Sequence, residues 1–497
     1  MIRETFQNIL DEKDVRQNLI KLKEELREDK KNDTHNKESL LYFLGGNFDI
    51  FYKLLKDEDA KVRKNTAIIM GELAVPSFLP KLYLAYQEET QRFVKSDYLK
   101  AMEEFDYREL LPEFEKRIEE LKKEPITEEN KKHVTEELKQ LTKLVLTMKG
   151  SKKHKFTGFD VTSELILLTN RNHIHVTLEQ LKNIPRKEFS AGVMVKTNEL
   201  RRIMEIRTYQ ELLFALPEVK TVPMDVHEAA KRLVEGKFFD FLLKRHEGEA
   251  PFYFRVELKS KSIENKGAFV KKLSAEIEHL SKRTLINSTT NYEVELRLIE
   301  NKDGKFNVLV KLYTLEDNRF EYRKEVIATS IRPVNAALTV ELAKHYLKEG
   351  AQVLDPFCGV GTMLIERDAI VPAKTMYGLD IYAEGIDKAR INAKAAGRVI
   401  NYINRDFFDF KHEYLFDEII TNMPSTRFKQ EEEALFTLYK RFFNKAKEHL
   451  KKEGIMVLYT HNREFVKRLG SKDGFRIEKE FEISMKEETY VFILRYM

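Results

Sequence analysis

The decisive stretch of this sequence is Val353-Leu354-Asp355-Pro356-Phe357-Cys358-Gly359-Val360-Gly361-Thr362. It reads as a short apolar strand that runs into an acidic residue and then into a glycine-spaced turn. Gly359 and Gly361 let the backbone approach a ligand, and the helix expected from Thr362 directs its free N–H groups at the same place. Leu364 stands where a dinucleotide fingerprint needs its third glycine, so a pyrophosphate is not the favoured ligand. The stretch therefore predicts a nucleotide-cofactor loop.

Three more short strands follow this loop, and polar residues mark their ends. The second strand is Tyr377 to Asp380, the third is Asn404 to Phe407, and the fourth is Asp417 to Asn422. Ligands of open parallel sheets bind beyond the carboxyl ends of the strands, so these polar residues are expected to surround one site. Taken singly, each acid has an ordinary alternative as a cap or a solvated strand end.

The order of these elements resembles that of the Rossmann-like methyltransferases, especially those that methylate an exocyclic amine of a nucleobase in RNA. The resemblance implies S-adenosylmethionine as cofactor, with Asp380 at the ribose and Asp406 at the adenine amine. Cys358, the only cysteine of the chain, is expected to pack in the loop and not to act as a nucleophile. The implied cofactor-binding residues are Asp355, Phe357, Gly359, Gly361, Thr362, Asp380, Ile381, Asp406 and Phe407.

The fourth strand leads into the turn that would carry the chemistry. In the family this turn reads Asp or Asn, Pro, Pro, aromatic, and here it reads Asn422-Met423-Pro424-Ser425. The resemblance implies that the Asn422 side chain and the next backbone carbonyl accept hydrogen bonds from the target amine, which makes Asn422 and Pro424 the catalytic candidates. The first proline and the aromatic residue are missing. The chain is then either an active enzyme with Phe428 as the substitute ring, which we favour, or a fold that binds cofactor or RNA without transferring methyl.

Composition limits the remaining alternatives. A chain of 497 residues is expected to hold about three domains, and its net charge of +5 is compatible with a nucleic-acid partner without requiring one. The single cysteine excludes a disulfide framework and fits a reducing cytoplasm. No run of eighteen apolar residues occurs, and the start has no apolar stretch long enough for a secretory signal. We expect a cytoplasmic protein with no membrane span, and we assign no metal site.

Residues 1–148 have a helical pattern with almost no turn signals. Within them, Leu54 to Ala67 resembles the interhelical turn and second helix of a HEAT repeat, and Phe93 to Met102 is a fainter copy. We predict a HEAT-like helical domain over residues 1–148. It serves either as a plain extension or as a surface for a protein partner, and a scaffold that recruits a protein to RNA is the alternative to an enzyme.

The middle of the chain follows a basic linker over residues 149–155. Strands are expected at residues 164–168, 174–176 and 191–195, and then a helix that carries Arg201, Arg202 and Arg207. This part resembles the ferredoxin-like domain that precedes a THUMP domain, and we assign it to residues 156–224. A helix over 226–245, a strand over 252–258, a helix over 269–282 and strands over 292–298 and 307–312 then resemble the THUMP domain itself, which we assign to residues 225–325.

A THUMP domain implies binding of a tRNA acceptor end or a comparable RNA terminus. The basic cluster of this region contains the RNA-binding candidates Arg255, Lys259, Lys261 and Lys266. Residues 326–497 complete the multidomain prediction as a Rossmann-like α/β methyltransferase domain, whose sheet is expected to have seven strands and an antiparallel end. By resemblance, the function is methylation of guanosine N2 in tRNA, with rRNA as the second candidate RNA and adenine N6 as the second target. The sequence leaves open which nucleotide is modified, the role of residues 1–148 and the oligomeric state.

Overall fold

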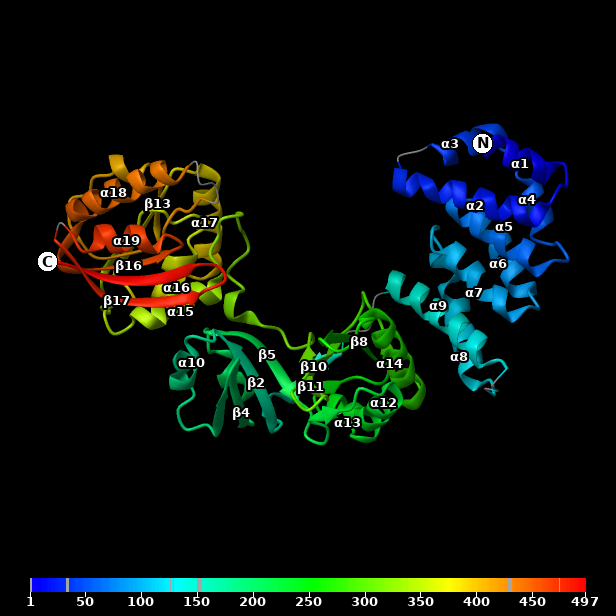
Figure 1. Cartoon of the computed structure of the whole chain (residues 1–497), viewed down its shortest axis with the longest axis horizontal. Coiled ribbons are helices and arrows are strands. Elements are labelled where there is room, and N and C mark those ends of the chain that lie inside the picture. The colour runs from blue at the N-terminus through cyan, green and yellow to red at the C-terminus, as the bar shows by residue number, and fades with distance from the viewer. Residues whose placement is uncertain are drawn as a thin grey trace. The chain divides into compact units, whose positions relative to one another are not determined.

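The computed structural model describes residues 2–32, 35–125, 127, 129–149, 154–426, 431–472 and 474–497. The chain divides into two compact units, of which the first contains residues 1–153 and 288–291 and the second contains residues 154–287 and 292–497 (Figure 1). Within the ranges that the structure describes, no helix is both long and apolar enough to cross a membrane. The same residues contain no group of three or more His, Cys, Asp or Glu side chains that could hold a metal ion.

The first unit is helical, as the sequence predicts. Its helices are α1 (Ile2–Leu10), α2 (Val15–Asn32), α3 (Asn36–Leu44), α4 (Asp49–Leu54), α5 (Ala60–Leu73), α6 (Phe78–Glu88), α7 (Arg92–Met102), α8 (Leu111–Lys123) and α9 (Lys131–Lys149). The turn expected after Leu54 separates α4 from α5, and the Asp59 side chain caps α5 by accepting a hydrogen bond from the Lys61 backbone. A Cβ added to Gly71 of α5 would lie 2.8 Å from the Ala101 Cα of α7, so these helices pack in close contact. The assignment to HEAT repeats stays a prediction.

The second unit begins with a mixed sheet that joins both of the expected middle domains. Its path runs β3-β4-β2-β5-β11-β10-β8-β9, with β6 also paired to β11, and the antiparallel pairing of β5 with β11 links the two halves. Its strands are β2 (Ser163–Thr169), β3 (Arg186–Phe189), β4 (Gly192–Thr197), β5 (Tyr209–Ala215), β6 (Thr221–Val222), β8 (Phe252–Lys259), β9 (Leu285–Asn287), β10 (Val294–Glu300) and β11 (Phe306–Leu312). The short strands β1 (Lys155–Phe156) and β7 (His246–Glu247) pair with each other in a separate two-stranded sheet. The helices are α10 (Ile174–Gln180), α11 (Leu200–Met204), α12 (Val226–Glu235), α13 (Phe238–Leu243) and α14 (Lys266–Leu280).

Three local predictions for this region are wrong. Residues 174–176 are not a strand but the first turn of α10, because a segment of three residues is too short to separate the two periodicities. Arg207 lies beyond the end of α11, and its guanidinium pairs with Glu366 at 2.6 Å. The helix expected over 226–245 is broken into α12 and α13 at Gly236 and at Lys237, whose φ of 60° does not continue a right-handed helix.

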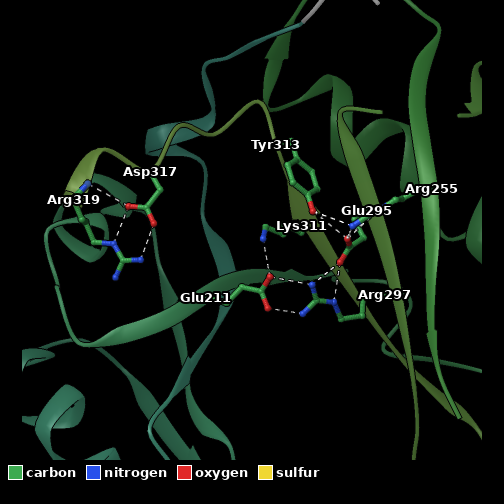
Figure 2. Close-up of polar contacts among 8 residues, drawn as sticks. All are labelled: Glu211, Arg255, Glu295, Arg297, Lys311, Tyr313, Asp317 and Arg319. Carbon is green, nitrogen blue, oxygen red and sulfur yellow. Dashed lines mark hydrogen bonds and ion pairs between the residues drawn. The ribbon is translucent and has the colours of Figure 1, made fainter. Parts of the chain in front are cut away.

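A row of linked charges crosses the first sheet. Figure 2 shows Glu211 of β5 between Lys311 of β11 and Arg297 of β10, and Glu295 between Arg297 and Arg255 of β8. Glu295 and Arg297 are buried, and Lys311 lies 2.8 Å from Glu211. Buried charges are retained only when they are paired, so this row is held together as one network.

The Glu211 carboxylate makes the stability of this sheet depend on acid. Burial raises its pKa, but hydrogen bonds from Arg297 and Lys311 outweigh burial and lower the pKa to about 2 from an ordinary value of 4.5. A lowered folded pKa adds stability above the ordinary value, and this stability is lost as the pH falls from 4.5 towards 2. We expect Glu211→Gln to destabilise the sheet at neutral pH, by an amount that shrinks as the pH falls through this window. Hydrogen exchange of β10 peptides in urea measures the effect, and Glu218→Gln, at an exposed position after β5, is the control.

The C-terminal sheet confirms the prediction of seven strands with an antiparallel end. Its order is β14-β13-β12-β15-β16-β18-β17, and β18 and β17 are antiparallel to their neighbours. The strands are β12 (Gln352–Asp355), β13 (Thr375–Asp380), β14 (Asn401–Asn404), β15 (Phe416–Asn422), β16 (Leu450–Thr460), β17 (Phe475–Ser484) and β18 (Thr489–Tyr496). The helices are α15 (Pro333–Ala343), α16 (Thr362–Ile370), α17 (Ala383–Ala395), α18 (Glu432–His449) and α19 (Arg463–Gly470).

This sheet is covered on both faces, which can be followed in Figure 1. Val353 of β12 belongs to the core shared with α15, α16 and α17, whereas its neighbour Leu354 belongs to the core shared with α18. Adjacent residues of a strand point to opposite faces, so each short apolar strand supplies both cores. The third strand ends at Asn404, two residues before Asp406, which instead caps the short helix η4 (Phe407–Asp409). The result is a doubly wound sheet with its strand ends gathered along one edge.

Candidate cofactor and active site

A cavity of about 690 Å³ lies at the carboxyl ends of β12, β13, β14 and β15. Every predicted cofactor-binding residue except Gly361 lines it, and so do both catalytic candidates. These lining residues are Asp355, Phe357, Gly359, Thr362, Asp380, Ile381, Asp406, Phe407, Asn422 and Pro424. The fold therefore brings residues from four separate strand ends to one place, as the rule for open α/β sheets predicts.

The glycine turn has a shape that only glycine adopts easily. Gly359 has a φ of 51° and Gly361 a φ of 81°. A Cβ on Gly361 would lie 2.1 Å from the hydroxyl oxygen of Tyr402, a buried side chain of β14. The turn therefore lies directly against the Tyr402 ring and has no room for a side chain at this position.

Asp380 holds this turn at the end of the neighbouring strand. Its Oδ2 accepts a hydrogen bond from the Gly359 backbone at 2.9 Å, and its Oδ1 accepts one from the Tyr382 backbone at 2.9 Å. Each carboxylate oxygen can accept a second bond, so both still have capacity for ligand hydroxyls. Ile381 between them is 73% exposed, and its apolar side chain lies at the cavity.

Asp355 and Asp406 each accept a hydrogen bond from a nearby backbone N–H and also line the cavity. Asp355 accepts a hydrogen bond from the Phe357 backbone, and Asp406 accepts one from the Phe408 backbone. Burial, with a smaller contribution from the charge of Asp380, raises the pKa of Asp355 to about 7. Burial also raises the pKa of the Cys358 thiol well above its usual value, which opposes formation of a thiolate and agrees with a packing role.

The turn after β15 shows how the chain accommodates its unusual sequence. Met423 has a backbone N–H, which proline lacks, and donates it to the Tyr459 carbonyl at 2.9 Å, while its side chain is buried. The Pro424 carbonyl accepts a hydrogen bond from the Tyr439 hydroxyl at 3.1 Å. Among the described residues, none forms a hydrogen bond with the Asn422 side chain, so its amide is available to a ligand. Phe428, the expected substitute ring, lies outside the described residues.

The cavity fits a nucleoside cofactor that bears hydroxyl and cationic groups. Its acids supply acceptors for such groups, and Ile381 supplies an apolar surface. The hydroxyl of Thr362, at the start of α16, is buried and has no partner among the described residues, so it is free for a ligand atom. Cofactor sites of this kind are mostly apolar with a few convergent polar groups.

Two parts of the cavity lie outside the four strand ends, and the sequence indicated only the first of them. Residues 327–331, which precede α15, line one side, and Leu438 and Arg441 of α18 line another. The two α18 residues are three positions apart, so they share a helix face. That spacing is the only sequence signal for them, and it does not separate a cavity wall from a solvated face.

The predicted RNA-binding residues do not share one environment. Arg255 is half-buried and bonded to Glu295 at 3.0 Å, as Figure 2 shows. Lys259 at the end of β8, Lys261 in the next loop and Lys266 at the start of α14 are exposed. No carboxylate of the described residues forms an ion pair with these three lysines. Their role in RNA binding stays a prediction, and Arg255 is the weakest member of the set.

Comparison with known proteins agrees with this geometry. Residues 321–490 match the family described as UPF0020, RMKL-like, methyltransferase domain. The structure is similar to that of TrmN from Thermus thermophilus, with 20% sequence identity and a TM-score of 0.53 over 67% of this chain and 99% of that one. It is also similar to a predicted N6-adenine-specific DNA methylase from Listeria monocytogenes str. 4b F2365, with 17% identity and a TM-score of 0.51 over 70% of this chain and 97% of that one. A third similar structure is that of SMU.472, described as a methyltransferase complexed with SAH, with 16% identity and a TM-score of 0.51 over 67% of this chain and 98% of that one.

Residues 321–490 therefore match a methyltransferase domain, the chain shares the fold of class I methyltransferases, and S-adenosylmethionine is the cofactor. The structural neighbours share the fold of about two thirds of the chain at low sequence identity. When bound, the cofactor supplies an activated methyl group. The acceptors and the shape of this cavity are those that would hold such a molecule.

The glycine turn gives a direct test of the cavity. We expect Gly361→Ala to lower affinity for S-adenosylmethionine at least tenfold, because the new methyl group meets the Tyr402 hydroxyl at 2.1 Å and displaces the turn. Gly397→Ala is the matched control, since Gly397 also has a positive φ but has no atom within 4 Å of an added Cβ, so only a backbone cost of about 1 kcal/mol is expected. Calorimetry measures both. Equal cofactor affinities in the two variants would show that the turn does not shape the site.

The raised pKa of Asp355 predicts how cofactor binding depends on pH. The carboxyl group is half neutral near pH 7, and a cationic ligand favours its charged form. Affinity for S-adenosylmethionine is therefore expected to rise several-fold from roughly pH 6 to pH 8, and S-adenosylhomocysteine, which lacks the sulfonium charge, is expected to show a smaller rise. Asp355→Asn removes the titrating group, so a pH dependence that persists in this variant would assign it to another residue.

Proposed function

We propose that the protein is an S-adenosylmethionine-dependent RNA methyltransferase that modifies an exocyclic amine, with guanosine N2 of tRNA as the first candidate target. The observation that carries this proposal is the free Asn422 amide, which lines the same cavity as Asp380 and Asp406. A methyl group held by the cofactor residues would therefore lie near an acceptor for an amine. An amide and a backbone carbonyl that accept hydrogen bonds from the amine would aim its lone pair at the methyl carbon.

The anchoring of the turn supports an active site despite its changed sequence. Two hydrogen bonds fix the backbone that follows Asn422. The Met423 N–H donates to the Tyr459 carbonyl, and the Pro424 carbonyl accepts from the Tyr439 hydroxyl. The Tyr439 hydroxyl is also 2.8 Å from the Thr460 hydroxyl, so the anchor belongs to a larger network. Preorganised acceptors stabilise a transition state only when they do not have to move. The loss of the first proline therefore does not imply a loss of activity.

RNA as the substrate rests on the resemblance of residues 156–325 to the ferredoxin-like and THUMP domains and on the three exposed lysines near β8 and α14. We assign these residues to RNA binding and residues 1–148 to a HEAT-like domain that binds a protein partner. A second function is an RNA-binding scaffold without catalysis, which the replacement of the family's aromatic residue by Ser425 favours. DNA is a further candidate substrate, since one structural neighbour is described as a predicted N6-adenine-specific DNA methylase.

Nucleoside mass spectrometry tests the function directly. RNA from a strain that lacks the gene is compared with wild-type RNA, in separate tRNA and rRNA fractions. We expect loss of one methylated nucleoside, with N2-methylguanosine in tRNA as the first candidate. If RNA from the two strains is identical and the purified protein binds cofactor but transfers no methyl to any nucleic acid, the scaffold function is supported instead.

Asn422 gives the sharpest test of catalysis. We expect Asn422→Ala to leave cofactor affinity near the wild-type value and to lower the single-turnover rate about a hundredfold to a thousandfold, the loss seen when one preorganised hydrogen-bonding group is removed. Asp380→Asn is the matched control: it is expected to weaken cofactor binding, because its carboxylate both bonds Gly359 and faces the cavity. A wild-type rate in Asn422→Ala would show that this residue only forms the turn.

A further inference from the structure

Arg441 is the single cation among the described residues that line the cofactor cavity. It lies on α18, three residues after Leu438, and both side chains face the cavity. The other charged residues of the lining are Asp355, Asp380 and Asp406, all acidic and all at strand ends. The cavity therefore has three carboxyl groups along the sheet edge and one guanidinium on the side of α18.

The guanidinium is held by an aromatic ring and not by an acid. The Arg441 Cζ lies 4.0 Å from the centre of the Phe408 ring, and the side chain is exposed. No carboxylate of the described residues pairs with it. Phe408 is itself fixed, because its backbone N–H donates to Asp406 at 2.9 Å. A stacked guanidinium keeps its N–H donors in a defined plane and leaves them free for a ligand.

We propose that Arg441 binds a backbone phosphate of the nucleotide that is presented to Asn422. A planar set of N–H donors matches two phosphate oxygens, and RNA carries one such anion at every nucleotide. The cofactor contains no phosphate, and its cationic and hydroxyl groups match the acids of the sheet edge. Arg441 thus positions the substrate in the proposed methyl transfer and does not take part in its bond changes. This inference rests on the proposed function.

The sequence of the turn after β15 explains why a phosphate contact from Arg441 would be needed. Ser425 is exposed and stands where the resemblance expects an aromatic ring to stack on the target base. Stacking on such a ring contributes about 1 to 3 kcal/mol per base, so its loss at Ser425 leaves the nucleotide less firmly held there. A charge-assisted contact from Arg441 would hold the nucleotide from its backbone side.

Arg441→Ala, Arg441→Lys and Arg468→Ala test the proposal in the full-length protein. Arg468 is the matched control, because it is also exposed and lies 4.9 Å from the centre of the Phe436 ring, yet neither residue lines the cavity. Filter binding measures affinity for in vitro transcribed tRNA across a salt series, with S-adenosylhomocysteine present, and calorimetry measures affinity for S-adenosylmethionine. Methyl transfer to the same transcripts gives KM and kcat separately.

We expect Arg441→Ala to weaken tRNA binding about tenfold and to flatten the salt dependence by about one unit, as loss of one phosphate contact does. KM for tRNA is expected to rise, while cofactor affinity changes less than twofold. Arg441→Lys is expected to keep the salt slope but to regain only part of the affinity, because an ammonium group lacks the planar fork. Arg468→Ala is expected to match the wild type in all assays.

Two results would overturn the proposal. An unchanged salt slope in Arg441→Ala would show that Arg441 does not contact a phosphate. A tenfold loss of cofactor affinity with unchanged tRNA binding would assign Arg441 to the cofactor carboxylate instead. Failure of the proposed function looks different, since the wild-type protein would then bind cofactor and yet methylate no transcript and no cellular RNA. Absence of tRNA binding by the wild-type protein would overturn this contact with tRNA and tRNA as the target, whereas rRNA would stay the second candidate.

Discussion

The hydrogen bond from the Gly359 backbone to the Asp380 carboxylate is the contact on which the rest of the site depends. It joins the loop after β12 to the end of β13, two neighbouring parallel strands. The same carboxylate accepts a bond from Tyr382 and so fixes the start of the segment that leads into α17. With these two ends locked, Ile381 is held outward at the cavity. One carboxylate thus shapes the loop and still faces the place where a ligand would bind.

This double role changes how the acids of the sequence are understood. A lone acid after a strand is either a cap or a ligand-binding group when it is judged from sequence. In this structure Asp355 and Asp406 each accept a hydrogen bond from one backbone N–H, Asp380 accepts one on each of its two oxygens, and all three acids line the cavity. The two interpretations therefore do not compete, because a carboxylate has more acceptor capacity than one N–H uses. A cap at a strand end holds the carboxylate, and with it the unused acceptor capacity, in a fixed position.

The seven-stranded sheet and its cavity could be predicted because each strand is short, apolar and followed by its own polar signal. Prediction failed where the local signal was ambiguous or absent. Residues 174–176 fit a strand and a helix equally, and Gly236 can mark a helix end but does not indicate the left-handed backbone of Lys237. The Arg255 pair with Glu295 was missed because its partner lies 40 residues away on a strand that pairs with β8 in parallel. Ion pairs across a sheet follow from register, which is a property of the folded chain.

The altered turn shows the same principle at the catalytic candidate. From sequence, methionine in place of proline looks like the loss of a rigid residue. In the fold, that exchange supplies a backbone N–H, and the N–H extends the contact between β15 and β16 by a hydrogen bond to Tyr459. Rigidity that proline would provide through its ring is provided through pairing and through the buried Met423 side chain. Loss of function in a motif is therefore better judged from the hydrogen bonds of its backbone than from the number of its residues that match the family. Here both residues after Asn422, Met423 and Pro424, are held by hydrogen bonds.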